Sequence, residues 1–98
     1  MSMLPYDDRD GWIWQDGVYV PWREAKVHVL THSLHYGSCV FEGERAYDGE
    51  VFKSEEHTER LHASAGMLDY KIPFSSDDIN AAKNELMNKM GFDNCYVR

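Results

Sequence analysis

The chain has 98 residues, and 17 aspartates and glutamates against 10 lysines and arginines give it a formal charge of −7 at pH 7. This length allows one domain with a modest core, and the negative charge excludes nucleic acid as a partner because phosphate backbones bind basic surfaces. No apolar run approaches the roughly 18 to 20 residues of a membrane span, so we expect no membrane partner and a cytoplasmic location.

The first predicted elements are β-strands. Two short runs rich in aromatic and β-branched residues, within 12–22, flank Asp16 and Gly17, a dipeptide suited to a tight hairpin turn. Residues 26–30 (KVHVL) alternate in polarity and predict a half-buried strand.

A second hairpin is predicted after Gly37, which breaks a short polar and aromatic connection. Residues 38–47 (SCVFEGERAY) alternate again and lead through a turn at Asp48 and Gly49 into residues 50–52.

The period then changes from strand to helix. Ser54 is the expected cap of a helix of roughly four turns, in which Leu61, Ala65 and Leu68 recur at helical spacing.

A second helix is predicted to begin at Ser75 or Ser76, with acidic residues in its first turn, and to stop at Gly91. Its apolar stripe consists of Ile79, Ala82, Leu86 and Met90. Residues 95–98 (CYVR) predict the start of a further strand.

The fold class that follows is α+β, an antiparallel sheet built from hairpins with two helices packed on one side. Residues 1–98 are expected to form a single domain. Because a chain rarely terminates in what reads as a buried strand, we expect these residues to be the N-terminal portion of a longer protein.

Alternation along 38–47 separates two faces of the predicted strand. One face carries Cys39, Phe41, Gly43, Arg45 and Tyr47; the other carries Ser38, Val40, Glu42, Glu44 and Ala46. A glycine inside a strand suits the close approach of another group, and an arginine beside it offers a planar fork for a carboxylate. By the same rule Tyr96 and Arg98 share one face of the last strand.

Spacing alone leaves another interpretation open, in which these arginines are solvated and the aromatic rings cover an apolar face. Arg60, between Glu56 and Glu59 on the first helix, has the spacing of an ordinary surface ion pair.

Metal binding is not predicted. Cys39 and Cys95 are too few and too far apart for a disulfide framework or a zinc site. His28, His32 and His35 have helical spacing, but no carboxylate or cysteine completes a recognisable ligand set. We therefore expect free thiols, hydrogen-bonding or surface histidines and no metal.

Several motifs resemble the N-terminal part of the branched-chain amino-acid aminotransferases, fold-type IV enzymes that use pyridoxal 5′-phosphate. The resemblance extends from about residue 12 to residue 98 and rests on AKVHVLTHSLHYGSCVFEGERAYDG, FKSEEHTERLHASAGMLDY and CYVR. HSLHYGSCVFEGERAY is its most specific part. Glu44 stands where isoleucine is commoner in the family, on the face that points away from the predicted site.

The resemblance implies a role for each of seven residues. Five would line the substrate pocket from two neighbouring strands, namely Phe41, Gly43, Arg45, Tyr96 and Arg98. Tyr36 would reach into the pocket of the partner subunit in a homodimer, and Arg60 would bind the phosphate of the cofactor.

The implied reaction transfers an amino group between leucine, isoleucine or valine and 2-oxoglutarate. Phe41 and Tyr36 would accept the branched side chain, and Arg98 or Arg45 the distal carboxylate. No lysine of this chain matches the catalytic lysine of the family, which lies in a second domain, so no catalytic residue is assigned here. The 98 residues alone are expected to be inactive.

Two other functions stay open at this stage. The chain could come from a fold-type IV lyase that acts on aminodeoxychorismate, although HYGSCVFEG is typical of the aminotransferases. It could also be a non-enzymatic dimerisation or ligand-binding module.

Overall fold

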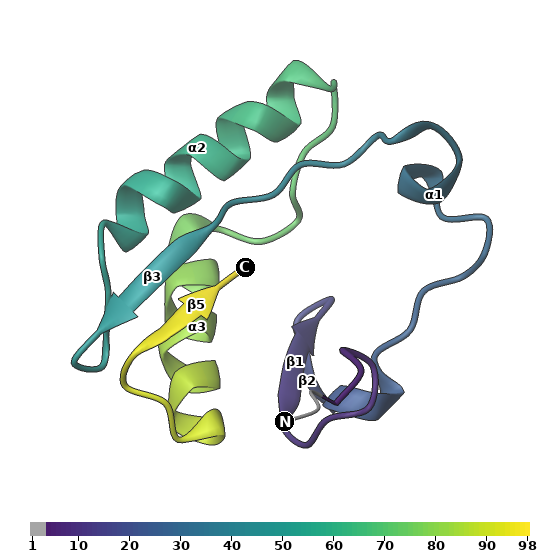
Figure 1. Cartoon of the computed structure of the whole chain (residues 1–98). Helices are drawn as coiled ribbons and strands as arrows, with labels where there is room; N and C mark the ends of the chain where they lie inside the picture. The colour runs from purple at the N-terminus through teal and green to yellow at the C-terminus, as the bar shows by residue number, and fades with distance from the viewer. Residues whose placement is uncertain (1–3) are drawn as a thin grey trace.

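The computed structural model describes residues 4–98 and has the predicted α+β class (Figure 1). Its strands and helices are, in chain order, β1 (Trp12–Gln15), β2 (Val18–Pro21), the 3-10 helix η1 (Trp22–Glu24), α1 (His32–Tyr36), β3 (Glu44–Tyr47), β4 (Glu50–Val51), α2 (Ser54–Met67), α3 (Ser76–Met90) and β5 (Cys95–Val97). The strands form two small antiparallel sheets, β1-β2 and β4-β3-β5, where the sequence predicted one sheet.

Both predicted hairpins are present. The turn aspartates Asp16 and Asp48 each have a φ of 51°, and Gly17 and Gly49 follow with φ of 87° and 84°. Consecutive positive φ values are what a type I′ hairpin turn requires, which confirms the Asp-Gly signal.

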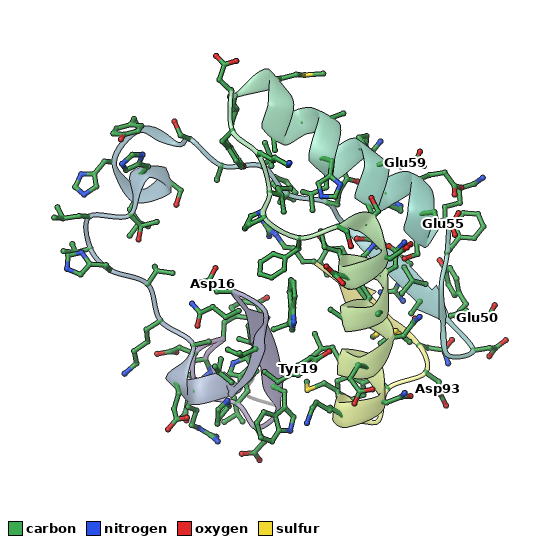
Figure 2. The ribbon with its side chains drawn as sticks, turned by 180° about the vertical axis from the view of Figure 1, so that it is seen from behind. Asp16, Tyr19, Glu50, Glu55, Glu59 and Asp93 are labelled. Atoms are coloured by element: carbon green, nitrogen blue, oxygen red, sulfur yellow. The ribbon has the colours of Figure 1, made fainter. Side chains whose placement is uncertain are left out.

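The first hairpin packs on α3. The Trp14 and Phe74 rings meet edge to face with centroids 4.9 Å apart, and the Tyr19 hydroxyl donates to the carbonyl oxygen of Ala82 at 3.3 Å. Figure 2 shows Tyr19 reaching from the hairpin towards α3.

The prediction of a strand at 26–30 is wrong, because the structure has no strand there. Val27 and Val29 are 63% and 69% exposed, and no strand among residues 4–98 pairs with them. Residues 26–43 instead form a wide arch with α1 at its outer end (Figure 1). A segment with alternating polarity forms a strand only where a neighbouring strand supplies backbone hydrogen bonds.

The second predicted strand is shorter than expected, since only residues 44–47 of 38–47 pair with other strands. β5 lies antiparallel beside β3, with Glu44 opposite Val97 and Arg45 opposite Tyr96. The predicted alternation holds from residue 41 onward, because residues 42, 44 and 46 are buried and residues 41, 43, 45 and 47 are exposed.

The two long helices are confirmed. α3 begins with a capping box between Ser75 and Asp78 and ends at Gly91 with φ 70°. α2 begins differently from the prediction, because Lys53 occupies the cap position in a left-handed conformation. Ser54 is already helical, and its hydroxyl lies 3.2 Å from both Asn80 Oδ1 and Lys83 Nζ.

The core contains a buried ion pair. Apolar buried residues are few and mostly small, namely Ala46, Ala65, Ile79, Ala82 and Met87. In the same buried region, Lys83 Nζ donates hydrogen bonds to Glu44 Oε1 and to Thr58 Oγ1, each at 2.7 Å. The lysine and glutamate side chains are only 9% and 5% exposed. The pair therefore joins β3 to both long helices.

Removing one partner of this pair should be strongly destabilising, while removing both should not. E44I or K83M alone leaves a buried charge without a partner, which costs about 3 to 5 kcal/mol of unfolding free energy in such sites. The double variant E44I/K83M should recover most of that loss. Urea unfolding followed by circular dichroism measures all three.

The exposed Lys53–Glu56 pair, 3.5 Å apart, supplies the control. K53M should change the unfolding free energy by less than about 1 kcal/mol. A double variant no more stable than the worse single variant would contradict the assignment of Glu44 and Lys83 as a compensating pair.

Candidate functional site

The outward face of β3 and of the segment before it forms the candidate site. Phe41 and Tyr96 are 61% and 54% exposed although both are large aromatic residues. The β3–β5 register brings Arg45 opposite Tyr96. The guanidinium carbon of Arg98 lies 4.4 Å from the centre of the Phe41 ring, a cation–π contact.

Gly43 lies directly under the phenol of Tyr96. A Cβ placed on Gly43 would come within 2.7 Å of the Tyr96 hydroxyl oxygen. The glycine in this position therefore lets the tyrosine lie across the backbone, which is the close approach that the sequence predicted. Phe41, Gly43, Tyr96 and Arg98 form one continuous exposed group, to which Arg45 belongs by its register.

Tyr36 is not brought to this group. It lies on α1, is 64% exposed, and packs against His32 with ring centroids 5.2 Å apart. Both views place α1 at the outer end of the arch, well away from β3 and β5 (Figures 1 and 2).

Arg60 contacts the opposite face of the same strand segment. Its Nε and Nη2 donate to the two carboxylate oxygens of Glu42 at 2.8 and 2.6 Å. His57 Nδ1 lies 2.7 Å from Glu42 Oε1. The sequence analysis named Arg60 as a site residue but did not predict its pairing with Glu42. One signal for the pairing was available, because Glu42 belongs to the face of the strand segment that turned out to be buried against the helices, and a buried carboxylate needs a cationic partner.

The charge of Glu42 is stabilised by these contacts. The Arg60 guanidinium, followed by the His57 ring, lowers the pKa of Glu42 from 4.5 to about 2. Glu42 is thus ionised at neutral pH and can only accept hydrogen bonds. His57 Nδ1 must therefore carry a hydrogen and donate it.

The candidate site is an open face. A cleft between the first hairpin and α3 is lined by Trp14, Tyr19, Phe74 and neighbouring residues and contains none of the predicted site residues. A second cleft, around Arg9 to Glu24, contains none either. Within residues 4–98 no three histidine, cysteine or acidic side chains are grouped closely enough to hold a metal ion.

Comparison with known proteins identifies the family. The model of the class IV aminotransferases matches residues 39–98, which include β3, both long helices and β5. The chain belongs to the class IV aminotransferases. A branched-chain-amino-acid aminotransferase of Pseudomonas aeruginosa is 47% identical over the whole chain, which covers 32% of that relative. The resemblance found in the sequence is confirmed.

Solved structures give the same result. The branched-chain amino acid aminotransferase of Escherichia coli superimposes with a TM-score of 0.85 at 39% identity, over 90% of this chain and 30% of that one. The T.th. branched-chain amino acid aminotransferase, complexed with N-(5′-phosphopyridoxyl)-L-glutamate, gives a TM-score of 0.84 at 41% identity, over 90% and 31%.

The chain spans about a third of the length of the curated aminotransferases that it matches. Among residues 4–98 no helix is both long and apolar enough to cross a membrane.

G43A should displace the ring of Tyr96 with little loss of stability. The obstructing atom is the far end of a half-exposed side chain that can move, so we expect less than about 1 kcal/mol of lost unfolding free energy. Altered NMR shifts of the Tyr96 ring would report the displacement. G66A is the control, because its new Cβ meets nothing within 4 Å; unchanged Tyr96 ring shifts in G43A would contradict the contact.

Acid should destabilise the fold partly through Glu42. Its pKa is lowered in the folded state, so its contribution is present above about pH 4.5 and is lost as the pH falls towards about 2. E42Q should therefore show a smaller fall in unfolding free energy between about pH 6 and about pH 3 than the wild type. The control E56Q, in an exposed pair, should retain the wild-type fall, and an E42Q protein with the full fall would count against the prediction.

Proposed function

We propose that the chain is the N-terminal domain of a pyridoxal 5′-phosphate-dependent branched-chain aminotransferase. It would supply substrate contacts and one phosphate contact to a site that a second domain completes. The observation that carries the proposal is the exposed group of Phe41, Gly43, Tyr96 and Arg98, in which apolar, phenolic and cationic surfaces adjoin. Bound pyridoxal phosphate supplies the electron sink for amino transfer.

The proposed substrates are leucine, isoleucine or valine on one side and 2-oxoglutarate on the other. Phe41 offers apolar surface to a branched side chain, and Arg98 stacks on that ring. A carboxylate that enters beside Phe41 would thus meet a guanidinium already held in place. Arg45 lies near Tyr47 instead, with its guanidinium carbon 5.9 Å from that ring, so we assign the distal carboxylate to Arg98.

Arg60 fits the phosphate of the cofactor. Two of its N–H groups bind Glu42, while no protein atom of residues 4–98 accepts a hydrogen bond from Nη1. Its side chain is 67% exposed. A dianionic phosphate accepts several hydrogen bonds and suits this free guanidinium edge.

The proton-moving lysine would come from outside these 98 residues. Of the five lysines, Lys83 is committed to Glu44 in the core, Lys53 pairs with Glu56 and Lys89 stacks over Trp12. Lys26 and Lys71 are exposed and lie outside β3 and β5. None therefore stands out as the catalytic group.

The quaternary arrangement is also part of the proposal. α1 and the arch expose Leu30, Leu34 and Tyr36 at 66%, 61% and 64%. Such a surface suits a homodimer in which Tyr36 enters the partner's pocket. A cytoplasmic location stays a prediction. No feature of residues 4–98 favours a lyase or a non-enzymatic module.

The test joins residues 1–98 to the C-terminal part of the Pseudomonas aeruginosa relative and follows glutamate formation from L-leucine and 2-oxoglutarate. The joined protein should be active and the 98 residues alone inactive. Turnover by the 98 residues alone would refute the proposed division of the site.

Arginine variants of the joined protein test the substrate assignment. R98Q should lower kcat/KM for 2-oxoglutarate at least about tenfold more than for a branched 2-oxo acid, because only the former has a distal carboxylate. R45Q is the matched control and should affect both substrates alike. The opposite pattern would transfer the assignment to Arg45.

A further inference from the structure

The Glu42 carboxylate has its hydrogen-bonding capacity directed at α2. Oε2 accepts from Arg60 Nε at 2.8 Å, and Oε1 accepts from Arg60 Nη2 at 2.6 Å and faces His57 Nδ1 at 2.7 Å. The glutamate side chain is 7% exposed and the arginine side chain 67%. A buried, rigid anion thus holds one edge of an exposed, flexible cation.

This contact fixes the plane of the guanidinium. Arginine has five N–H donors in one plane, and Glu42 takes Nε and one hydrogen of Nη2 side by side. Of the remaining three N–H groups, one on Nη1 and one on Nη2 form the outer edge, and the third, on Nη1, lies on the side of Cδ. An unrestrained arginine on a helix surface would sample many rotamers and present that edge only part of the time.

Charge alone cannot explain a carboxylate in this position. An anion beside Arg60 reduces the positive potential that a phosphate would experience. Further acidic side chains, Glu55 and Glu59, extend from α2 itself (Figure 2). The benefit of Glu42 to an anion site must therefore be geometric.

We infer that Glu42 is a positioning residue that orients Arg60 towards the phosphate of the cofactor. The inference rests on the proposed function, which assigns the phosphate to Arg60. His57 helps to hold the Glu42 carboxylate in place, because its Nδ1 lies 2.7 Å from Oε1, the oxygen that also accepts from Arg60 Nη2. Because Glu42 lies between Phe41 and Gly43 in the chain, the same strand segment aligns the phosphate arginine with the substrate face.

The test uses the joined protein described above, freed of pyridoxal phosphate and labelled with ¹⁵N, and two probes that differ only in a phosphate group, pyridoxine 5′-phosphate and pyridoxine. Neither probe has an aldehyde that reacts with lysines. In the wild type, the Arg60 Nε–H signal should exchange slowly with water and should shift with the phosphorylated probe only.

Two variants separate geometry from charge. E42Q loses the charge and places an N–H donor against the guanidinium, and E42D keeps the charge but is one methylene shorter. Both should accelerate Nε–H exchange and weaken binding of the phosphorylated probe, about tenfold in E42Q. The control E56Q, which removes a neighbouring exposed carboxylate, should not weaken binding. Amide spectra establish that each variant is folded, and E42D alone decides the matter if E42Q is not.

Unchanged or tighter binding in the folded variants would overturn the inference, because Glu42 would then compete with the phosphate instead of positioning its arginine. A wild type in which Arg60 is held by Glu42 but does not respond to the phosphorylated probe would refute the assignment of Arg60 itself, and with it this part of the proposed function. The two failures are thus distinguishable.

Discussion

Antiparallel pairing of β3 with β5 is the constraint on which the rest of the structure depends. It sets which residues of the strand face the helices and which face outward. Glu42, Glu44 and Ala46 are buried on the helix side, while Phe41, Gly43 and Arg45 are exposed. A shift of register by one residue would bury the candidate site and expose two carboxylates.

On the helix side of this strand segment, the buried residues are two glutamates and a single small apolar residue, Ala46. Glu44 reaches Lys83 on α3, and Glu42 reaches Arg60 on α2. The two glutamates are two residues apart, Glu44 in β3 and Glu42 just before it, and they bind different helices. Structural and functional demands therefore meet in one segment, since the first pair lies in the core and the second adjoins the proposed phosphate site.

Local signals in the sequence predicted much of the fold. The Asp-Gly turns and the start of α3 at Ser75 or Ser76 depend on neighbouring residues, and the structure confirms them. The prediction of a strand at 26–30 is wrong because alternating polarity does not reveal whether a partner strand exists. The prediction that Ser54 caps α2 is wrong because Asn80 and Lys83, which are distant in sequence, contact its hydroxyl. Likewise, Arg60 and Glu42 are 18 residues apart, and spacing within one helix could not pair them.

The most direct test of this account is the register of β3 against β5, measured by nuclear Overhauser contacts in the 98-residue chain. The account predicts backbone contacts between Arg45 and Tyr96, together with a contact between Gly43 and the Tyr96 ring. Backbone contacts that pair Tyr96 with Glu44 instead would exchange the two faces of the strand and contradict it.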